Sequence, residues 1–171
     1  MNELTLKFNL QSRSEASLVT VELRNAISPY TLVESAHGNG GGNVAATFSF
    51  EKAVDDTPYY IVVKGASILE TWSAIPVTFN LQKASFDFTS ATSQAFGNNQ
   101  IILNGMPSIF TGDVNQDGLI DLSDLMATYT AASDYLTGAV STDVNGDGVV
   151  DLSDITVVYD NGAMFVGVVK P

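Results

Sequence analysis

The chain has 171 residues, the length of one or two domains, and 45% of them are apolar, including nine Phe and six Tyr. Its formal net charge of −12 and its seven Lys and Arg argue against nucleic-acid binding and against a basic membrane-surface segment. It contains no Cys, which excludes disulfides and thiolate chemistry, and no apolar run approaches the roughly 20 residues of a membrane span.

The negative charge is concentrated in the C-terminal third. Residues 111–171 contain ten Asp, no Glu and one Lys, a net charge of −9, whereas residues 1–110 contain nine acidic and six basic side chains, a net charge of −3. Eight of the ten Asp lie in two similar short segments. The acidity therefore indicates metal binding, and it is not that of a disordered acidic tail.

Residues 1–105 are predicted to form a β-sandwich. Apolar and polar residues alternate with the period of half-buried strands, and the continuous run 59–64 is typical of a central strand. About seven strands separated by turn signals predict an antiparallel sandwich of the immunoglobulin or fibronectin-III-like kind. The expected strands are 4–10, 19–23, 44–50, 59–64, 77–81, 86–88 and 101–103.

Three features of this region were weighed for other roles. His37, the only His, has no nucleophile or metal ligand at a useful spacing, so we expect an exposed loop residue. Trp72, the only Trp, could stack on a sugar if exposed, but a core position is commoner in sandwiches. The pair Asp55-Asp56 precedes Pro58 in a turn, where neighbouring side chains point apart. No catalytic constellation emerges, and we predict a non-enzyme.

Residues 106–111 are expected to link the sandwich to a second module, residues 112–171. Within this module a segment of twelve residues, Asp113–Asp124, returns thirty positions later as Asp143–Asp154. Each copy has side-chain oxygens at positions 1, 3, 5, 9 and 12 and a Gly at position 6. This pattern lets one short loop surround Ca²⁺, which takes about six to eight oxygens. Without a cation, so many close carboxylates would repel one another, so we predict two Ca²⁺ per chain.

The predicted ligands follow the positions of a Ca²⁺ loop, with a backbone carbonyl at position 7 and position 9 often acting through a water. In the first loop they are Asp113, Asn115, Asp117, the Leu119 carbonyl, Asp121 and Asp124. In the second loop they are Asp143, Asn145, Asp147, the Val149 carbonyl, Asp151 and Asp154.

A helix is predicted after each loop but not before it. Leu122, Leu125, Met126 and Tyr129 have the i, i+3, i+4, i+7 spacing of a helix face, and the second copy repeats the pattern. We expect most of this stripe to pack the two helices together in a thin core. Asn161-Gly162 should end the second helix, and residues 165–169 should pack against Ile109 and Phe110.

This duplicated loop-then-helix unit resembles the dockerin modules of cellulosomal and other bacterial or archaeal extracellular proteins, over about residues 112–165. The resemblance rests on Asp at position 12 (Asp124 and Asp154), on the absence of entering helices and on the Asp-Leu or Asp-Ile step into each helix. The repeat offset of 30 residues is long for that family. The sandwich is similar to the fibronectin-III-like or carboxypeptidase-regulatory-like modules that precede dockerins, and we expect it to be X-module-like.

The resemblance implies a protein partner of the cohesin type. Dockerins contact the partner through residue pairs just before position 12, which correspond here to Leu122-Ser123 and Leu152-Ser153. An apolar residue followed by a small polar one looks more like the second major dockerin class than the first.

The leading hypothesis is a non-catalytic, extracellular, Ca²⁺-binding docking protein. Near-millimolar Ca²⁺ outside cells favours that location, although Met1-Asn-Glu-Leu lacks the basic and apolar regions of a signal peptide. One alternative is a Ca²⁺-stabilised structural protein that self-assembles into fibres or a surface layer. Another is a carbohydrate-binding sandwich with a Ca²⁺-stabilised tail.

Overall fold

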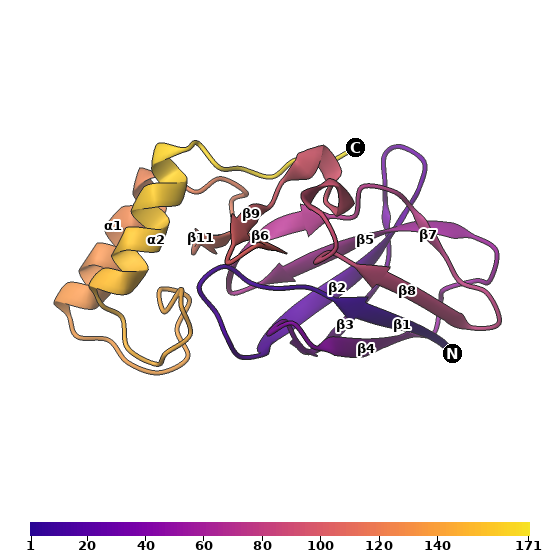
Figure 1. Ribbon diagram of the computed structural model, residues 1–171, viewed down its shortest axis with the longest axis horizontal. Coiled ribbons are helices and arrows are strands. Elements are labelled where there is room, and N and C mark those ends of the chain that lie inside the picture. Colours follow the sequence, from indigo (N-terminus) through magenta and orange to yellow (C-terminus); the bar gives the residue numbers. More distant parts are fainter.

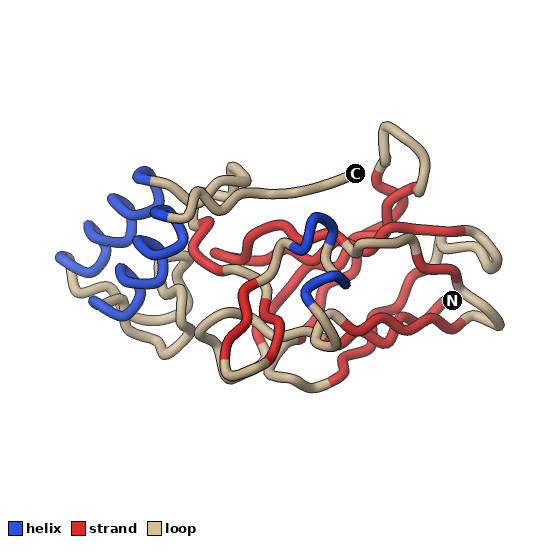
Figure 2. Tube along the Cα trace, turned by 45° about the horizontal axis from the view of Figure 1, so that its top comes forward, coloured by secondary structure: helices blue, strands red, loops and turns tan.

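The computed structural model describes residues 1–171 as a β-sandwich with two helices packed at one end. Figure 1 shows the two helices side by side, and the C-terminal segment running from α2 back over the sandwich. The tube view of Figure 2 shows the same separation of helices and strands. No helix has the length and apolar character needed to cross a membrane.

The strands form two main sheets and a small hairpin. One sheet has the order β4-β1-β8, the other has the order β11-β6-β5-β2-β3 with β7 added beside β5, and β9 pairs with β10. The strands are β1 (Asn2–Lys7), β2 (Ser17–Asn25), β3 (Leu32–Gly40), β4 (Ala45–Phe50), β5 (Pro58–Gly65), β6 (Ser67–Trp72), β7 (Val77–Thr78), β8 (Lys83–Asp87), β9 (Ile101–Leu103), β10 (Met106–Ser108) and β11 (Thr111–Asp113). Two short 3₁₀ turns, η1 (Thr92–Gln94) and η2 (Phe96–Asn98), lie between β8 and β9.

The sandwich core follows from the alternation of the strands. In β1 the side chains of Leu4 and Leu6 are buried while those of Glu3 and Thr5 are exposed, because successive residues point to opposite faces of a strand. The predicted sandwich is thus confirmed. A cluster of 18 buried side chains fills the space between the sheets: Leu4, Leu6, Phe8, Leu10, Val19, Val21, Leu23, Phe48, Phe50, Tyr59, Ile61, Val63, Ile68, Phe79, Phe86, Phe88, Ala95 and Ile109.

The sequence missed four strands and one strand direction. β3 escaped notice because Leu32–Gly40 is polar and glycine-rich, and its pairing with β2 is decided by the sheet. β1 and β8 run parallel, so the sandwich is not wholly antiparallel. Residues 106–111, expected as a linker, form β10 and the start of β11, with Ile109 and Phe110 buried.

Each acidic loop leads directly into a helix of twelve residues, α1 (Leu122–Ser133) or α2 (Leu152–Ala163). The N-caps are Asp121 and Asp151, and each forms a reciprocal capping box with the Asp three residues later. α2 ends at Ala163, one residue after the predicted stop at Asn161-Gly162. The buried Asn161 side chain serves another purpose, described below.

The helix stripe lies the other way round from the prediction. Leu122, Met126 and Tyr129 are exposed, whereas the buried residues of α1 are Asp124, Thr128 and Ala131. Small and polar residues can approach the sandwich and the second helix closely, so the larger side chains are left on the outer surface. Leu125, and Val158 of α2, do pack into a core, but the prediction that most of the stripe is buried is wrong.

The helices share their core with the sandwich. A second cluster joins Ile120, Val144 and Val158 of the C-terminal part to Leu69 of β6 and to Phe110. Val166 belongs to the same cluster, so the predicted packing of the closing segment against Phe110 is confirmed. Phe165 instead points into solvent.

Candidate functional site

The two acidic loops adopt the same hydrogen-bond frame around their closing Asp. Asp124 Oδ1 accepts hydrogen bonds from the N–H groups of Val114 (2.9 Å) and Asn115 (3.2 Å), and Oδ2 accepts one from Asp121 N–H (3.0 Å). In the second loop Asp154 repeats all three bonds, at 2.7, 2.9 and 3.0 Å. The identical spacing of the two sequences thus produces identical local geometry.

The ligand positions before the turn also repeat. Asp113 Oδ2 accepts from Gly118 N–H at 3.1 Å, and Asn115 Oδ1 accepts from Asp117 N–H at 2.9 Å. The matching distances in the second loop are 3.0 and 2.8 Å. Gly118 and Gly148 have φ of 90° and 89°, a left-handed conformation that explains Gly at position 6.

The position 9 carboxylates, Asp121 and Asp151, act as helix caps. Each accepts hydrogen bonds from the backbone N–H and the hydroxyl of the Ser two residues later, at 2.6–2.7 Å. These bonds, with the hydroxyl contribution largest, lower the pKa of both carboxyls below their usual value. Both groups are therefore ionised wherever the protein is folded near neutral pH.

Four carboxylates are buried in the loops, and one of them is incompletely bonded. Asp113, Asp124, Asp143 and Asp154 are at most 5% exposed. Asp113 Oδ1 has no hydrogen-bond partner, whereas Asp143 Oδ1 accepts from Gly146 N–H at 2.8 Å. Burial, reinforced by the charge of Asp124, raises the pKa of Asp113 to about 6. A buried carboxylate oxygen without a donor is a position that a cation would satisfy.

The frame has the spacing predicted for a metal loop, but no three acidic or histidine side chains converge on one point. The remaining predicted ligand atoms are oxygens of Asn115, Asn145 and the carbonyls of Leu119 and Val149. Such neutral oxygens are normal Ca²⁺ ligands. The predicted donors are all oxygens and so fit a hard cation, although the carboxylates of each loop do not form one cluster here.

Each loop pairs with the chain segment that follows the helix of the other repeat. Val168 N–H donates to Gly118 O at 2.8 Å and Ile120 N–H donates to Val166 O at 2.9 Å. In the second loop, Gly138 N–H donates to Gly148 O at 2.8 Å and Val150 N–H to Leu136 O at 3.0 Å. The two repeats thus complete each other, and neither loop forms its full frame alone.

The sandwich holds the C-terminal part through a buried amide network. Asn161 Nδ2 donates to Gln11 Oε1 at 2.6 Å and to Thr111 O at 2.7 Å, while Gln11 Nε2 donates to Asn161 Oδ1 at 3.1 Å. Gln11, Thr111 and Asn161 are all buried. Sequence reasoning missed this network because 150 residues separate Gln11 from Asn161.

A second link is Arg13, which the sequence did not single out. Its Nε donates to Val144 O and its Nη2 to Asp143 O, both at 2.8 Å, at the start of the second loop. Burial lowers the pKa of Arg13, while the charges of Asp143 and Asp154 oppose that shift. The first loop has a neutral link instead, from the Gln116 amide to Gly65 O.

The predicted partner-binding pairs lie at the outer ends of the helices. Leu122 and Leu152 are 68% and 72% exposed. Ser123 and Ser153 are exposed, but their hydroxyls are engaged with the loops, each accepting from an Asn side chain. An apolar groove of about 380 Å³ lies beside Leu122 but not beside Leu152, and it is lined by residues of the first loop, both helices and the C-terminal segment: Leu119, Ile120, Asp121, Leu122, Leu125, Val158, Tyr159, Gly162, Ala163 and Phe165.

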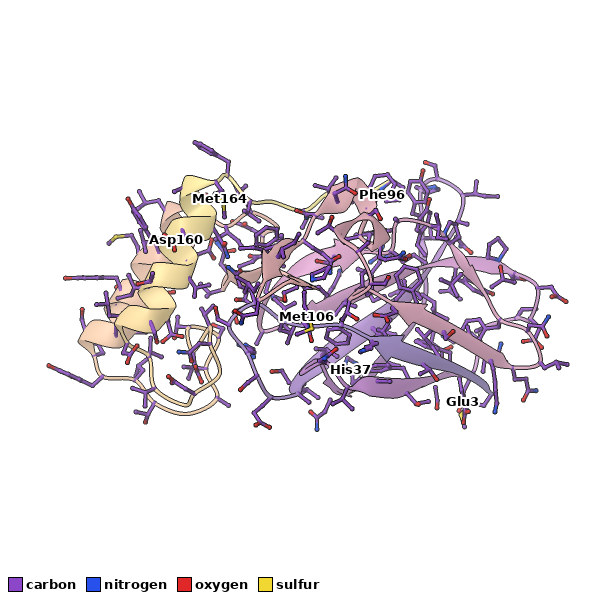
Figure 3. The ribbon with its side chains drawn as sticks, viewed as in Figure 1. Glu3, His37, Phe96, Met106, Asp160 and Met164 are labelled. Atoms are coloured by element: carbon purple, nitrogen blue, oxygen red, sulfur yellow. The ribbon has the colours of Figure 1, made fainter.

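Trp72 is buried and offers no platform for a sugar, but it belongs to neither hydrophobic core cluster, so the expected core position is wrong. It is 3% exposed, with Arg24 5.4 Å above its ring and Tyr30 and Tyr60 at its edges. His37 is exposed but lies on strand β3, not in a loop, beside the hydroxyl of Thr20 (Figure 3).

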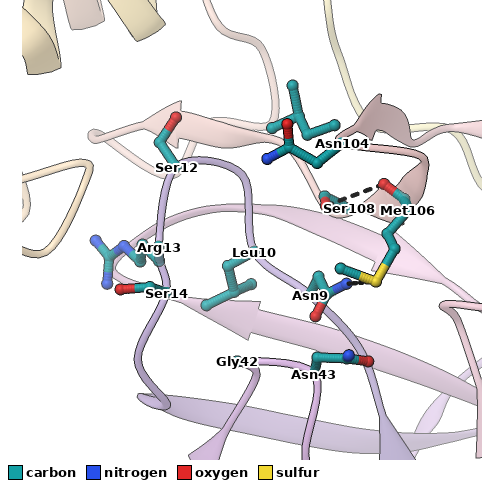
Figure 4. Close-up of a pocket in the computed structure, with 11 residues that line it drawn as sticks. Asn9, Leu10, Ser12, Arg13, Ser14, Gly42, Asn43, Asn104, Met106 and Ser108 are labelled. Atoms are coloured by element: carbon teal, nitrogen blue, oxygen red, sulfur yellow. Dashed lines mark hydrogen bonds between the residues drawn. The ribbon is translucent and has the colours of Figure 1, made fainter.

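A polar pocket of about 440 Å³ lies among the sandwich loops, at one end of β9 and β10 (Figure 4). Its amide side chains come from Asn9, Asn43 and Asn104, and no aromatic residue lines it. Figure 4 shows the Arg13 guanidinium directed away from Asn9 and Leu10. Arg13 thus lines this pocket while its guanidinium bonds the second acidic loop.

Comparison with known proteins identifies the fold. The structure matches a chain of a C-terminal interface mutant of a type II cohesin–X-dockerin complex from Acetivibrio cellulolyticus, with a TM-score of 0.57 and 17% identity, covering 94% of this chain and 95% of that one. An N-terminal interface mutant of that complex matches with a TM-score of 0.54, the same identity and the same coverage. No protein-family model and no curated protein sequence matches this chain.

The match confirms the predicted fold class, a β-sheet domain followed by a two-helix C-terminal module in the order of an X-module and a dockerin.

Proposed function

We propose that this chain is a Ca²⁺-dependent docking protein that binds a cohesin-type partner outside the cell. The observation that carries the proposal is the repeated hydrogen-bond frame of the two loops, in which Asp113 Oδ1 is buried without a donor. We keep residues 1–105 and 112–171 as its two domains, with 106–111 packed between them as a rigid connection.

Two Ca²⁺ would be held by the oxygens at positions 1, 3, 5, 7, 9 and 12 of each loop. The ion supplies positive charge to carboxylates that folding has already removed from water. Because these side chains are gathered only in the folded chain, Ca²⁺ would bind the native state and stabilise it. Its role here is therefore structural, and the extracellular setting supplies the concentration that weak loop sites need.

Docking is proposed for the outer face of the helices. Leu122, Met126 and Tyr129 of α1, with Leu152 and Tyr159 of α2, are all more than half exposed. The matching chains come from complexes with a cohesin, which supports a partner of that class. Exposed apolar side chains on a rigid frame are what a protein interface buries.

Calorimetric titration of the metal-free protein tests the Ca²⁺ sites. We expect two Ca²⁺ per chain, and one after Asp113→Ala/Asp117→Ala or after Asp143→Ala/Asp147→Ala. Absence of binding at micromolar to millimolar Ca²⁺ in protein with a folded sandwich would overturn this part of the proposal.

Surface plasmon resonance against a panel of type II cohesins tests the partner. We expect binding in Ca²⁺ that is lost in EDTA and in Leu122→Asp/Leu152→Asp. Ile27→Asp is the matched control, since Ile27 is equally exposed but lies on the sandwich. Equal loss in the control, or binding to none of the cohesins, would contradict the proposed surface.

Self-assembly is the second candidate, and the exposed aromatic pair favours it. Tyr135 and Phe165 occupy equivalent positions after the two helices, and each is 87% exposed. Light scattering with and without Ca²⁺ separates the two functions. Growth of large particles in Ca²⁺ supports assembly, whereas a constant monomer supports docking to another protein.

A further inference from the structure

The two loops differ in what the sandwich contributes to them. In the first loop, Asp113 continues strand β11 and pairs with Ser67 of β6, so ordinary sheet bonding positions its start. In the second loop no strand reaches Asp143. Its place is taken by the side chain of Arg13, which lies 130 residues earlier in the chain.

The Arg13 guanidinium is held from both sides. Toward the sandwich, Nη1 donates to Ser17 Oγ at 3.1 Å and Nη2 donates to Ser67 Oγ at 2.9 Å. Toward the loop, Nη2 and Nε donate to the carbonyls of Asp143 and Val144. Four bonds from a planar group with five N–H donors fix its orientation.

Two peptide groups connect this cation to the closing carboxylate. The peptide whose carbonyl belongs to Asp143 presents the Val144 N–H to Asp154 Oδ1 at 2.7 Å. The next peptide, whose carbonyl belongs to Val144, presents the Asn145 N–H to the same oxygen at 2.9 Å. Arg13 therefore binds the oxygen end of both peptides, and Asp154 binds the hydrogen end.

This arrangement aligns two dipoles between a positive and a negative charge. Hydrogen bonds at one end of a peptide strengthen those at the other, because each polarises the group between them. The equivalent bonds to Asp124 in the first loop, which has no guanidinium, are longer at 2.9 and 3.2 Å. Shorter hydrogen bonds to Asp154 than to Asp124 are expected if Arg13 strengthens the bonds that the two peptide groups donate.

We propose that Arg13 is the positioning residue of the second Ca²⁺ loop: its guanidinium orients the two N–H groups that hold Asp154, so Arg13 sets the Ca²⁺ affinity of this loop and not of the first. This inference rests on the proposed function. A positive charge beside the loop also repels Ca²⁺, and the orienting effect outweighs that repulsion because Arg13 binds carbonyls and leaves the carboxylates free.

Calcium calorimetry on the full chain tests the proposal, with one loop active at a time. In the Asp113→Ala/Asp117→Ala background, where only the second loop binds, Arg13→Met should weaken Ca²⁺ binding at least tenfold. In the Asp143→Ala/Asp147→Ala background the same change should alter binding by less than about twofold.

Two further variants identify the cause. Arg13→Lys keeps the positive charge but lacks the planar guanidinium with its several N–H donors, so its Ca²⁺ affinity should lie between those of Arg13→Met and the unchanged chain. Arg24→Met is the matched control, since Arg24 contacts Glu22 and Trp72 on the sandwich surface, and it should leave both loops unchanged. Tighter binding in Arg13→Met, or equal weakening of both loops, would overturn the proposal.

Amide hydrogen exchange in the metal-free protein separates this inference from the Ca²⁺ proposal. Arg13→Met should speed exchange of the Val144 and Asn145 N–H groups about tenfold or more, while those of Val114 and Asn115 stay unchanged. If the wild-type protein binds no Ca²⁺ but shows this effect, the positioning role stands and the metal function fails. Unchanged exchange at Val144 and Asn145 would reject the positioning role itself.

Discussion

The sandwich and the helical part of this molecule are stabilised in different ways. The sandwich encloses 18 buried side chains, six of them from Phe residues of its own strands and turns. The helical part shares a cluster of seven, of which Leu69 and Phe110 lie outside its loops and helices. The sandwich thus has a hydrophobic core of its own, whereas the core of the helical part is completed by residues of the sandwich.

The difference explains the composition of the helices. Their inner faces carry small and polar residues such as Thr128, Ala131 and Asn161, which fit against the sandwich and against each other. A thin core leaves little hydrophobic stabilisation. The helical part therefore relies on hydrogen bonds to the sandwich, and several of its large apolar side chains remain exposed.

The largest effect should come from the sandwich core. Phe8 is fully buried and its ring packs against Gly40, so Phe8→Ala should lower the free energy of unfolding by about 3–5 kcal/mol. Because the helices pack on the sandwich, both the Trp72 fluorescence and the helical circular dichroism should be lost together in urea. Loss of the sandwich signal alone would show that the helical part folds independently.

Breaking the amide network should have the next largest effect. Gln11→Ala leaves Thr111 N–H and Asn161 Oδ1 without partners, although Asn161 Nδ2 keeps Thr111 O, and the change should cost about 1–3 kcal/mol. In a double-mutant cycle with Asn161→Ala, the second change should cost less once the first is present. Strictly additive costs would show that the two amides do not act as a unit.

The pH dependence of the first loop should be smaller but specific. Asp113 has a pKa raised to about 6, so at pH 5 a proton would occupy it and Ca²⁺ affinity of this loop should fall roughly tenfold from pH 7. Calorimetry on the variant in which only the first loop is intact would measure its Ca²⁺ affinity at pH 5 and pH 7. Equal affinity at the two pH values would contradict the prediction.

The raised pKa of Asp113 also makes the stability of the metal-free protein depend on pH. The folded state holds the proton more tightly than the unfolded state, so Asp113 lowers stability as pH rises from about 4 to 6. Ca²⁺ should therefore add more to the unfolding free energy at pH 7 than at pH 5.

The smallest effect should come from the outer face of the helices. Met126→Ser and Tyr129→Ser should each change the free energy of unfolding by less than about 0.5 kcal/mol, because both side chains are more than half exposed. Ile120→Ala, on the inner side, should cost about 2–5 kcal/mol by comparison. A large cost at Tyr129 would place it in the core, as the sequence alone suggested.

Prediction succeeded where the signal is local. The alternation in β1, the continuous apolar run of β5 and the helix directly after each acidic loop all follow from neighbours within a few residues. The predicted burial of the helix stripe was wrong because the spacing of apolar residues shows that one helix face is apolar, but it does not show whether that face packs in a core or is exposed to solvent. Strand β3 was not predicted because its sequence is polar and glycine-rich, and only its pairing with β2 makes it a strand.

The sequence by itself determined the two loops, since their turns, caps and internal hydrogen bonds depend on residues at most eleven positions apart. It also determined the Ca²⁺ prediction, which remains to be tested. Only the tertiary structure decided how the loops are supported, because Arg13 meets Val144 across 131 residues and Gln11 meets Asn161 across 150. The pattern of residues along the chain cannot predict such contacts, since each depends on how the sandwich brings distant segments of the chain together.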